Sequence, residues 1–115
     1  MLEDQAPDAE LTVRHLRDGG IDCTWERVDN EAAFRQALRN TPDLIISDAQ
    51  LPGFGVEAAL EIARTVAPQI PFIVFSGAPW DHTAQALLAA GATAYVCKAD
   101  TRALVPAVQR ALTRL

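Results

Sequence analysis

Two short runs of apolar residues place the strongest constraint on what this chain can fold into. Leu44–Ile46 and Phe72–Phe75 are continuously apolar and do not alternate with polar residues. Strands with both faces buried have such runs, which are typical of a parallel sheet covered by helices on each side. Cys23–Val28 and Ala94–Val96, also rich in β-branched or aromatic residues, are predicted as further strands.

Segments with helical spacing alternate with these strands, so the expected order is one helix followed by four strand–helix units. That order predicts a doubly wound α/β fold. Gly19-Gly20 and Gly91 are placed to end helices, and Asp29 or Asn30 can cap the helix that follows. The apolar positions at helical spacing are Val13 and Leu16; Phe34, Ala37 and Leu38; Leu60, Ala63 and Ala67; Ala84, Leu87 and Leu88; and Leu104, Val108, Leu112 and Leu115.

The start of the chain departs from this pattern. Only Met1-Leu2 precede the acidic pair Glu3-Asp4, so the strand expected before the first helix is almost entirely missing. Either the fold lacks this strand or the sequence begins late.

Composition excludes several classes of protein. The chain has 115 residues, the size of one domain, with a net charge of −5, so it has no field that would gather nucleic acid. No apolar run reaches the ~20 residues of a membrane span. Two cysteines, Cys23 and Cys97, form neither a disulfide framework nor a zinc site, and we expect reduced thiols in a cytoplasmic protein.

Polar residues follow three of the predicted strands and the N-terminal stub Met1-Leu2. Ligands of an open parallel sheet bind at the carboxyl ends of its strands, so these residues are expected to converge. Three carboxylates that lie close together need a cation, and Mg²⁺ suits them. A lysine beside them can hold a phosphoryl oxygen, and a strand-end aspartate can act as a nucleophile. The residues are Glu3-Asp4, Asp48, Ser76-Gly77 and Lys98.

Each of these residues taken alone has an ordinary structural explanation. Asp48 alone is typical of a loop or cap, Lys98 of a surface side chain and Ser76-Gly77 of a turn. Their joint placement at the strand ends is what favours a functional interpretation.

With these residues the sequence resembles the receiver domain of two-component response regulators over essentially its whole length. That family has an acidic pair after strand one, a phosphoacceptor Asp after strand three and a Leu/Met-Pro shortly afterwards. A Ser/Thr follows strand four and a Lys follows strand five. The segments 42–53 and 91–98 match this pattern very closely, with Leu51-Pro52 in the expected place.

The resemblance implies a role for each matching residue at the metal and phosphoacceptor site. Asp48 would accept the phosphoryl group and, with Lys98, form the catalytic pair. Asp4, Glu3, Asp48 and the carbonyl of Gln50 would hold Mg²⁺.

Further roles follow for the phosphoryl-binding and switch residues. Ser76, Gly77 and Lys98 would bind the phosphoryl oxygens. Ser76 and Tyr95 would form a switch pair, in which the hydroxyl is drawn toward the phosphoryl group and the ring turns inward.

The resemblance also implies an architecture and partners. We expect a flavodoxin-like sheet in the order 2-1-3-4-5, and residues 1–115 as a single receiver domain without an effector domain. Expected partners are a sensor histidine kinase or phosphotransfer protein, a downstream protein or effector domain, and a second copy in a homodimer. No direct nucleic-acid or membrane contact is expected. The domain would not be an enzyme beyond Mg²⁺-dependent self-phosphotransfer and slow autodephosphorylation.

Two departures from the family pattern stand out. In the order 2-1-3-4-5 the missing strand is central, so its absence predicts unpaired edges around an apolar gap between 23–28 and 44–47. The gap would mean either a shortened chain or a gap filled by another copy. The loop Gly53–Gly55 is one residue short and lacks the usual acid or amide.

Three rival interpretations remain. A pseudo-receiver would use the same fold as a phosphorylation-independent interaction module, which the missing strand favours and the intact Asp48, Ser76 and Lys98 oppose. A phosphatase of the haloacid dehalogenase type would need a general acid where Gln50 stands. A flavin binder would meet repulsion between its phosphate and the acidic strand ends unless a metal intervened.

Overall fold

A three-stranded parallel sheet forms the centre of the molecule. A computed structural model describes residues 1–3, 6–21, 23–49, 53–77 and 82–113. The strands β1 (Ile45–Ser47), β2 (Phe72–Ser76) and β3 (Ala94–Cys97) lie in the order β1-β2-β3. Every residue of β1 and β2 is buried, as their continuous apolar runs predict.

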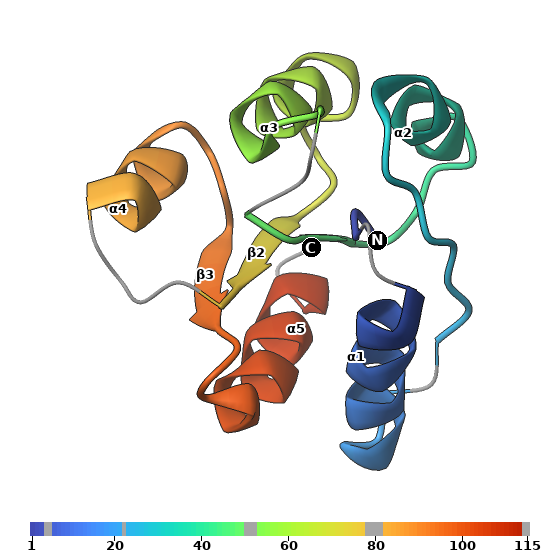
Figure 1. Cartoon of the computed structure of the whole chain (residues 1–115), viewed down its shortest axis with the longest axis vertical. Coiled ribbons are helices and arrows are strands. Elements are labelled where there is room, and N and C mark those ends of the chain that lie inside the picture. Colours follow the sequence, from blue (N-terminus) through green and yellow to red (C-terminus); the bar gives the residue numbers. More distant parts are fainter. Residues whose placement is uncertain (4–5, 22, 50–52, 78–81, 114–115) are drawn as a thin grey trace.

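Helices cover both faces of the sheet, so the predicted α/β class is confirmed (Figure 1). The helices divide between the two faces according to the core to which they contribute, and a 3₁₀ turn (Thr101–Ala103) leads into the last helix. The first face carries α1 (Ala6–Asp18) and α5 (Leu104–Leu112); the second carries α2 (Glu31–Leu38), α3 (Val56–Val66) and α4 (His82–Ala89).

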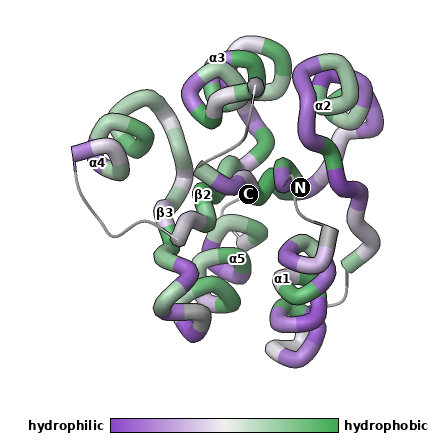
Figure 2. The backbone as a smooth tube through the Cα atoms, in the orientation of Figure 1, coloured by the Kyte–Doolittle hydropathy of each residue, from purple (hydrophilic) through white to green (hydrophobic). Residues whose placement is uncertain are grey.

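The central strand separates two apolar cores. Successive side chains of a strand point to opposite faces, so Phe72 and Val74 pack on the side of α2 and α3, whereas Ile73 and Phe75 pack against α5. Figure 2 shows apolar residues along the strands and hydrophilic residues on the outer turns of α1 and α2. The sheet is therefore held from both faces, and its strand ends have fixed positions.

Local signals set several helix boundaries as expected. The Asn30 side chain accepts a hydrogen bond of 2.8 Å from the Ala33 N–H and caps α2. Gly20, just beyond α1, has a φ of +91°, a conformation that glycine adopts without steric cost. Pro106 lies in the first turn of α5, where the absence of its N–H breaks no helical hydrogen bond.

The N-terminal residues occupy the position of the missing strand at one end only. Leu2 is fully buried and forms parallel bridges to both Val28 and Ser47. Its N–H donates to the Ile46 carbonyl at 2.8 Å, and its own carbonyl accepts from the Asp48 N–H at 2.9 Å. These bridges follow the expected order, in which the first strand lies between the second and the third.

The predicted strand Cys23–Val28 is wrong except at Val28. Only Val28 forms a bridge, and the described residues 23–27 belong to no strand. A strand needs a neighbour to bond its backbone groups, and among the described residues the backbone partners of this segment are Met1 and Glu3. The local pattern favoured a strand, and the absence of a partner prevented it.

An arginine near the end of α3 bonds the loop that follows this helix and lies next to a glycine that leaves room for it. The Arg64 guanidinium donates hydrogen bonds to the Pro68 and Ile70 carbonyls, where α3 turns toward β2. Gly91, between α4 and β3, has a φ of +116°, and a Cβ there would lie 2.9 Å from the Arg64 Cδ. The arginine cannot move away without losing these bonds.

We therefore predict that Gly91→Ala lowers the free energy of unfolding by about 2 kcal/mol or more, because it adds a contact with the held Arg64 side chain to the strain at positive φ. Gly20→Ala is the matched control, since Gly20 also has a positive φ but nothing lies within 4 Å of its added Cβ. We expect a loss of about 1 kcal/mol there. Urea unfolding measures both losses, and equal losses would contradict the role given to Arg64.

Candidate functional site

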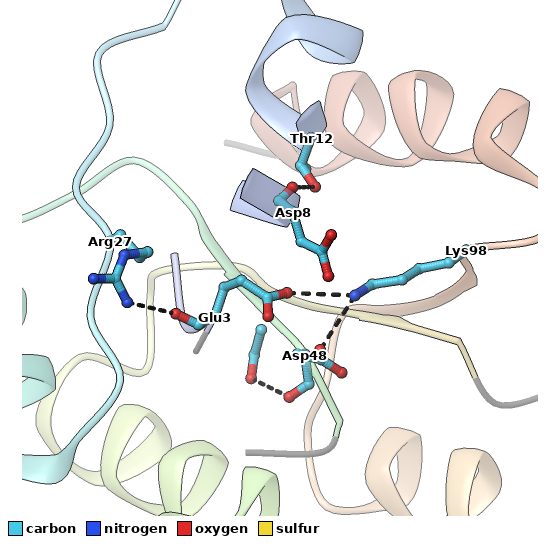
Figure 3. A network of polar contacts seen from close by, with 7 residues as sticks. Glu3, Asp8, Thr12, Arg27, Asp48 and Lys98 are labelled. Atoms are coloured by element: carbon cyan, nitrogen blue, oxygen red, sulfur yellow. Dashed lines mark hydrogen bonds and ion pairs between the residues drawn. The ribbon is translucent and has the colours of Figure 1, made fainter. Parts of the chain in front are cut away.

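Three charged side chains from distant parts of the chain meet at the carboxyl edge of the sheet (Figure 3). The Lys98 Nζ lies 3.3 Å from the Glu3 Oε2 and 3.2 Å from the Asp48 Oδ2. Glu3 follows the N-terminal bridge, Asp48 follows β1 and Lys98 follows β3. The predicted convergence is therefore found for these three residues.

The site lies largely out of solvent. The side chains of Glu3, Asp48 and Lys98 are 6%, 13% and 27% exposed. Burial of the ammonium opposes its charge, but the hydrogen bond that it donates to Asp48 and the charges of Asp48 and Glu3 outweigh burial and raise the pKa of Lys98 above its usual value. The stabilisation from the charged lysine is therefore complete at neutral pH and is lost only as the pH rises through that raised pKa.

Backbone hydrogen bonds fix the positions of the two strand ends. The Asp48 N–H donates to the Leu2 carbonyl, and the Ser47 hydroxyl donates to the Asp48 carbonyl at 2.8 Å. At the next strand end, the Lys98 N–H donates to the Ser76 carbonyl at 2.6 Å. The Lys98 Nζ also lies 5.8 Å from the centre of the Phe75 ring, within the range of a cation–π contact.

The predicted phosphoryl-binding and switch residues lie on the two neighbouring strands. Ser76 is fully buried at the end of β2 and is in register with Cys97, one residue before Lys98. Gly77 follows it and is exposed. Tyr95 is half-buried on β3, in register with Val74, and packs against the core on the side of α2 and α3.

Two of the predicted metal ligands, Asp4 and Gln50, lie outside the described residues. Within the described ranges, no group of three His, Cys, Asp or Glu side chains has the arrangement of a metal site. The oxygen donors described there are the carboxylates of Glu3 and Asp48, which share the Lys98 ammonium. Oxygen donors of this kind suit a hard cation such as Mg²⁺.

Two residues near the site were missed by the sequence analysis. The Arg27 Nη1 donates to the Glu3 carbonyl at 3.2 Å and so joins the segment after α1 to the N-terminal bridge. Figure 3 shows Asp8, in the first turn of α1, with its carboxylate directed toward Glu3 and Lys98. The acidic first turn was the available signal for Asp8; for Arg27 there was none, because its contact depends on how the chain packs.

The site places two negative carboxylates, those of Glu3 and Asp48, within 3.3 Å of one positive ammonium, that of Lys98. The carboxylates favour a cation, and the ammonium favours the oxygens of an anion such as a phosphoryl group. An aspartate at a strand end, beside both, is placed to act as a nucleophile. The edge can therefore bring a cation, an anion and a carboxylate nucleophile together.

Comparison with known proteins establishes the family. Residues 1–109 match the response regulator receiver domain model, so the chain belongs to that family of signalling domains. It is 33% identical over 103 residues to a gliding motility regulatory protein of Myxococcus xanthus, a match that covers 87% of this chain and 13% of that protein. The chain therefore spans a small part of the curated relative that it matches.

Solved structures agree on the fold. A two-component response regulator of the LuxR family from Aurantimonas is 28% identical, with a TM-score of 0.80, over 97% of this chain and 82% of that one. A response regulator receiver domain protein from Clostridium thermocellum is 19% identical, with a TM-score of 0.83, over 98% of this chain and 91% of that one. The second likeness is one of fold alone. In the described part of the chain, no helix has the length and apolar character to cross a membrane.

The shared ion pairs predict a specific double-mutant result. Lys98→Met leaves the Glu3 and Asp48 carboxylates without their shared counter-charge, so we expect the free energy of unfolding in EDTA to fall by about 2 kcal/mol. Adding Glu3→Gln removes one of the two carboxylates and should recover part of the loss. Urea unfolding of the wild type, both single variants and the double variant tests this; additive losses would contradict a shared lysine.

Proposed function

We propose that this receiver domain accepts a phosphoryl group on Asp48 and signals through changed protein contacts. The donor is a phosphohistidine of a sensor histidine kinase or phosphotransfer protein. The observation that carries the proposal is the placement of Glu3, Asp48 and Lys98 within one hydrogen-bonded group at the carboxyl edge of the sheet. Membership of the receiver family supports the same chemistry.

The proposed reaction moves a phosphoryl group from nitrogen to oxygen. A carboxylate oxygen of Asp48 attacks the phosphorus, the P–N bond breaks with its electron pair going to the imidazole, and an acyl phosphate forms. Lys98, whose Nζ is 3.2 Å from Asp48 Oδ2, holds a phosphoryl oxygen as a point charge. The hydroxyl of Ser76 and the backbone of Gly77 bind the other phosphoryl oxygens.

The carboxylates of Glu3 and Asp48 supply the hard oxygen donors that Mg²⁺ prefers. They already hold positive charge between them, in the form of the Lys98 ammonium. The proposed ligands are Glu3, Asp4, Asp48 and the Gln50 carbonyl, and the ion would neutralise charge on the carboxylates and the phosphoryl oxygens when bound. This chain's own contribution is to hold Glu3 and Asp48 at one strand edge, out of water.

The proposed switch uses Ser76 and Tyr95. Phosphorylation draws the buried Ser76 hydroxyl toward the phosphoryl group, and the half-buried Tyr95 ring turns into the space beside it. The surface of α4, β3 and α5 changes in consequence, and this surface is the proposed contact for a downstream protein, an effector domain or a second copy. We propose residues 1–115 as one receiver domain acting in the cytoplasm.

Phosphorylation is expected to depend on one aspartate. Incubation with acetyl phosphate and Mg²⁺ should add one phosphoryl group to the intact mass of the wild type and none to Asp48→Asn, which lacks the nucleophile. Asp43→Asn is the matched control, because Asp43 lies just before β1 at the opposite edge of the sheet and is exposed. It should be phosphorylated like the wild type.

Failure of the wild type to gain mass, with folding intact by circular dichroism, would contradict the proposal and favour the pseudo-receiver. A gain that persists in Asp48→Asn would place the phosphoryl group on another residue.

Mg²⁺ binding should depend on Glu3. We expect Mg²⁺ to raise the Tm of the wild type, and Glu3→Gln to weaken the apparent affinity by about tenfold or more, since it removes a charged oxygen donor. Glu57→Gln, on the exposed first turn of α3, is the control and should leave the affinity unchanged. Equal affinities for the Glu3 and Glu57 variants would remove Glu3 from the metal site.

A further inference from the structure

A groove of about 700 Å³ lies between α3 and α4. Figure 1 shows α4 beside α3, on the side of α3 away from α2. Leu60 of α3 and Leu87 of α4 line the groove and are buried, so they form its base. Ala86 and Ala90 are exposed and line the side of α4, and their small side chains leave space beside α3. The groove is therefore open to solvent and apolar at its base.

Two glutamates form the rim of this groove on α3. Glu57 and Glu61 both line it, are both exposed and lie one helical turn apart. Like charges at this spacing destabilise a helix. The helix dipole favours Glu57 in the first turn of α3, but Glu61 lies beyond that turn. Among the described residues neither carboxylate belongs to an ion pair. The rim therefore favours an occupant with positive charge.

Arg64 does not supply that positive charge, although it also lines the groove just beyond Glu61. Its guanidinium instead donates to two backbone carbonyls of the turn toward β2. On α2 the comparable pair does form, because the Arg35 Nε lies 3.0 Å from the Glu31 Oε2, four residues earlier. In the described structure, α3 thus lacks the internal counter-charge that α2 has.

An amphipathic helix has the chemistry that this groove requires. Such a helix places its apolar face in a groove, and its polar side chains meet the rim. Lys or Arg side chains one turn apart on that helix would match the spacing of Glu57 and Glu61, and their aliphatic stems would cover the apolar base. The net charge of −5 would also attract a basic segment and repel an acidic one.

We propose that the groove between α3 and α4 docks a basic amphipathic helix of a partner protein. The apolar face of that helix lies over Leu60 and Leu87, and its Lys or Arg side chains face Glu57 and Glu61. The groove differs from the surface of α4, β3 and α5 proposed for signalling, although both include α4. Docking here needs no phosphoryl group on Asp48, so the inference does not rest on the proposed function.

The test titrates the full chain with two synthetic peptides of about four helical turns each. The first has Leu along one face, Lys along both edges of that face and Ala elsewhere. The second has Glu in place of each Lys. In low salt we expect calorimetry to detect binding of the Lys peptide alone, and the amide NMR signals of Leu60 and Leu87 to shift with it. Failure of the wild type to bind the Lys peptide would overturn the proposal.

Reversing the charge of the rim tests the role of the two glutamates. Glu57→Lys with Glu61→Lys should weaken binding of the Lys peptide by about tenfold or more and should allow binding of the Glu peptide. Glu10→Lys with Asp18→Lys is the matched control, since it changes the net charge equally at exposed positions of α1. It should weaken binding by less than about threefold, because separated surface charges are screened. Equal losses in both double variants would reduce the effect to general attraction and overturn the proposal.

Filling the groove tests its shape without a change in charge. Ala86→Trp places a large side chain in the groove from an exposed position and should weaken binding of the Lys peptide by about fivefold or more. Ala58→Trp is the matched control, on an exposed position of α3 that does not line the groove, and should bind like the wild type. Urea unfolding checks that both variants are folded. Equal affinities of the two folded Trp variants would place the peptide elsewhere and overturn the proposal.

Discussion

Two carboxylates held near each other out of water need a cation, and this requirement organises the molecule. Lys98 meets it with one ammonium that contacts both Glu3 and Asp48. The contact joins the N-terminal segment, the end of β1 and the end of β3, which are far apart in the chain. Because parallel strands bring their carboxyl ends to one edge, the fold that buries the apolar runs also brings these charges together.

The same contact sets the charge and the positions of Asp48 and Lys98 in the protein without a ligand. Asp48 and Glu3 more than offset the desolvation of the Lys98 ammonium and raise its pKa, so the positive charge beside Asp48 is in place in the unliganded protein. Backbone bonds from Asp48 to Leu2 and from Lys98 to Ser76 hold both groups on rigid strand ends. Pre-organised charges of this kind would need little rearrangement for the proposed transfer of a phosphoryl group to Asp48.

Much of this could be predicted because its signals are local. The continuous apolar runs predicted β1 and β2, and the capping residue Asn30 was one of two residues predicted to start α2. The strand predicted at Cys23–Val28 failed because strand formation depends on a neighbour, which no local pattern reports. The bond from Arg27 to the Glu3 carbonyl was missed for the same reason, since it exists only after α1 packs on the sheet.

The placement of Glu3 has a further consequence. Glu3 belongs to a short segment that the described structure holds through a few backbone bonds, the buried Leu2 side chain and the contacts of Glu3 with Lys98 and Arg27, and a segment with few contacts opens more readily than a core. The acidic edge is complete only while this segment is docked, so docking and the proposed cation binding at Glu3 would be thermodynamically linked. Linkage is reciprocal: firmer docking would raise the apparent affinity for a cation that binds only the docked form, and that cation would raise the docked-to-open ratio. A difference of about 1.4 kcal/mol in docking free energy corresponds to a tenfold change in this ratio. The affinity of this edge for cations is therefore an indirect gauge of how firmly the first three residues are held.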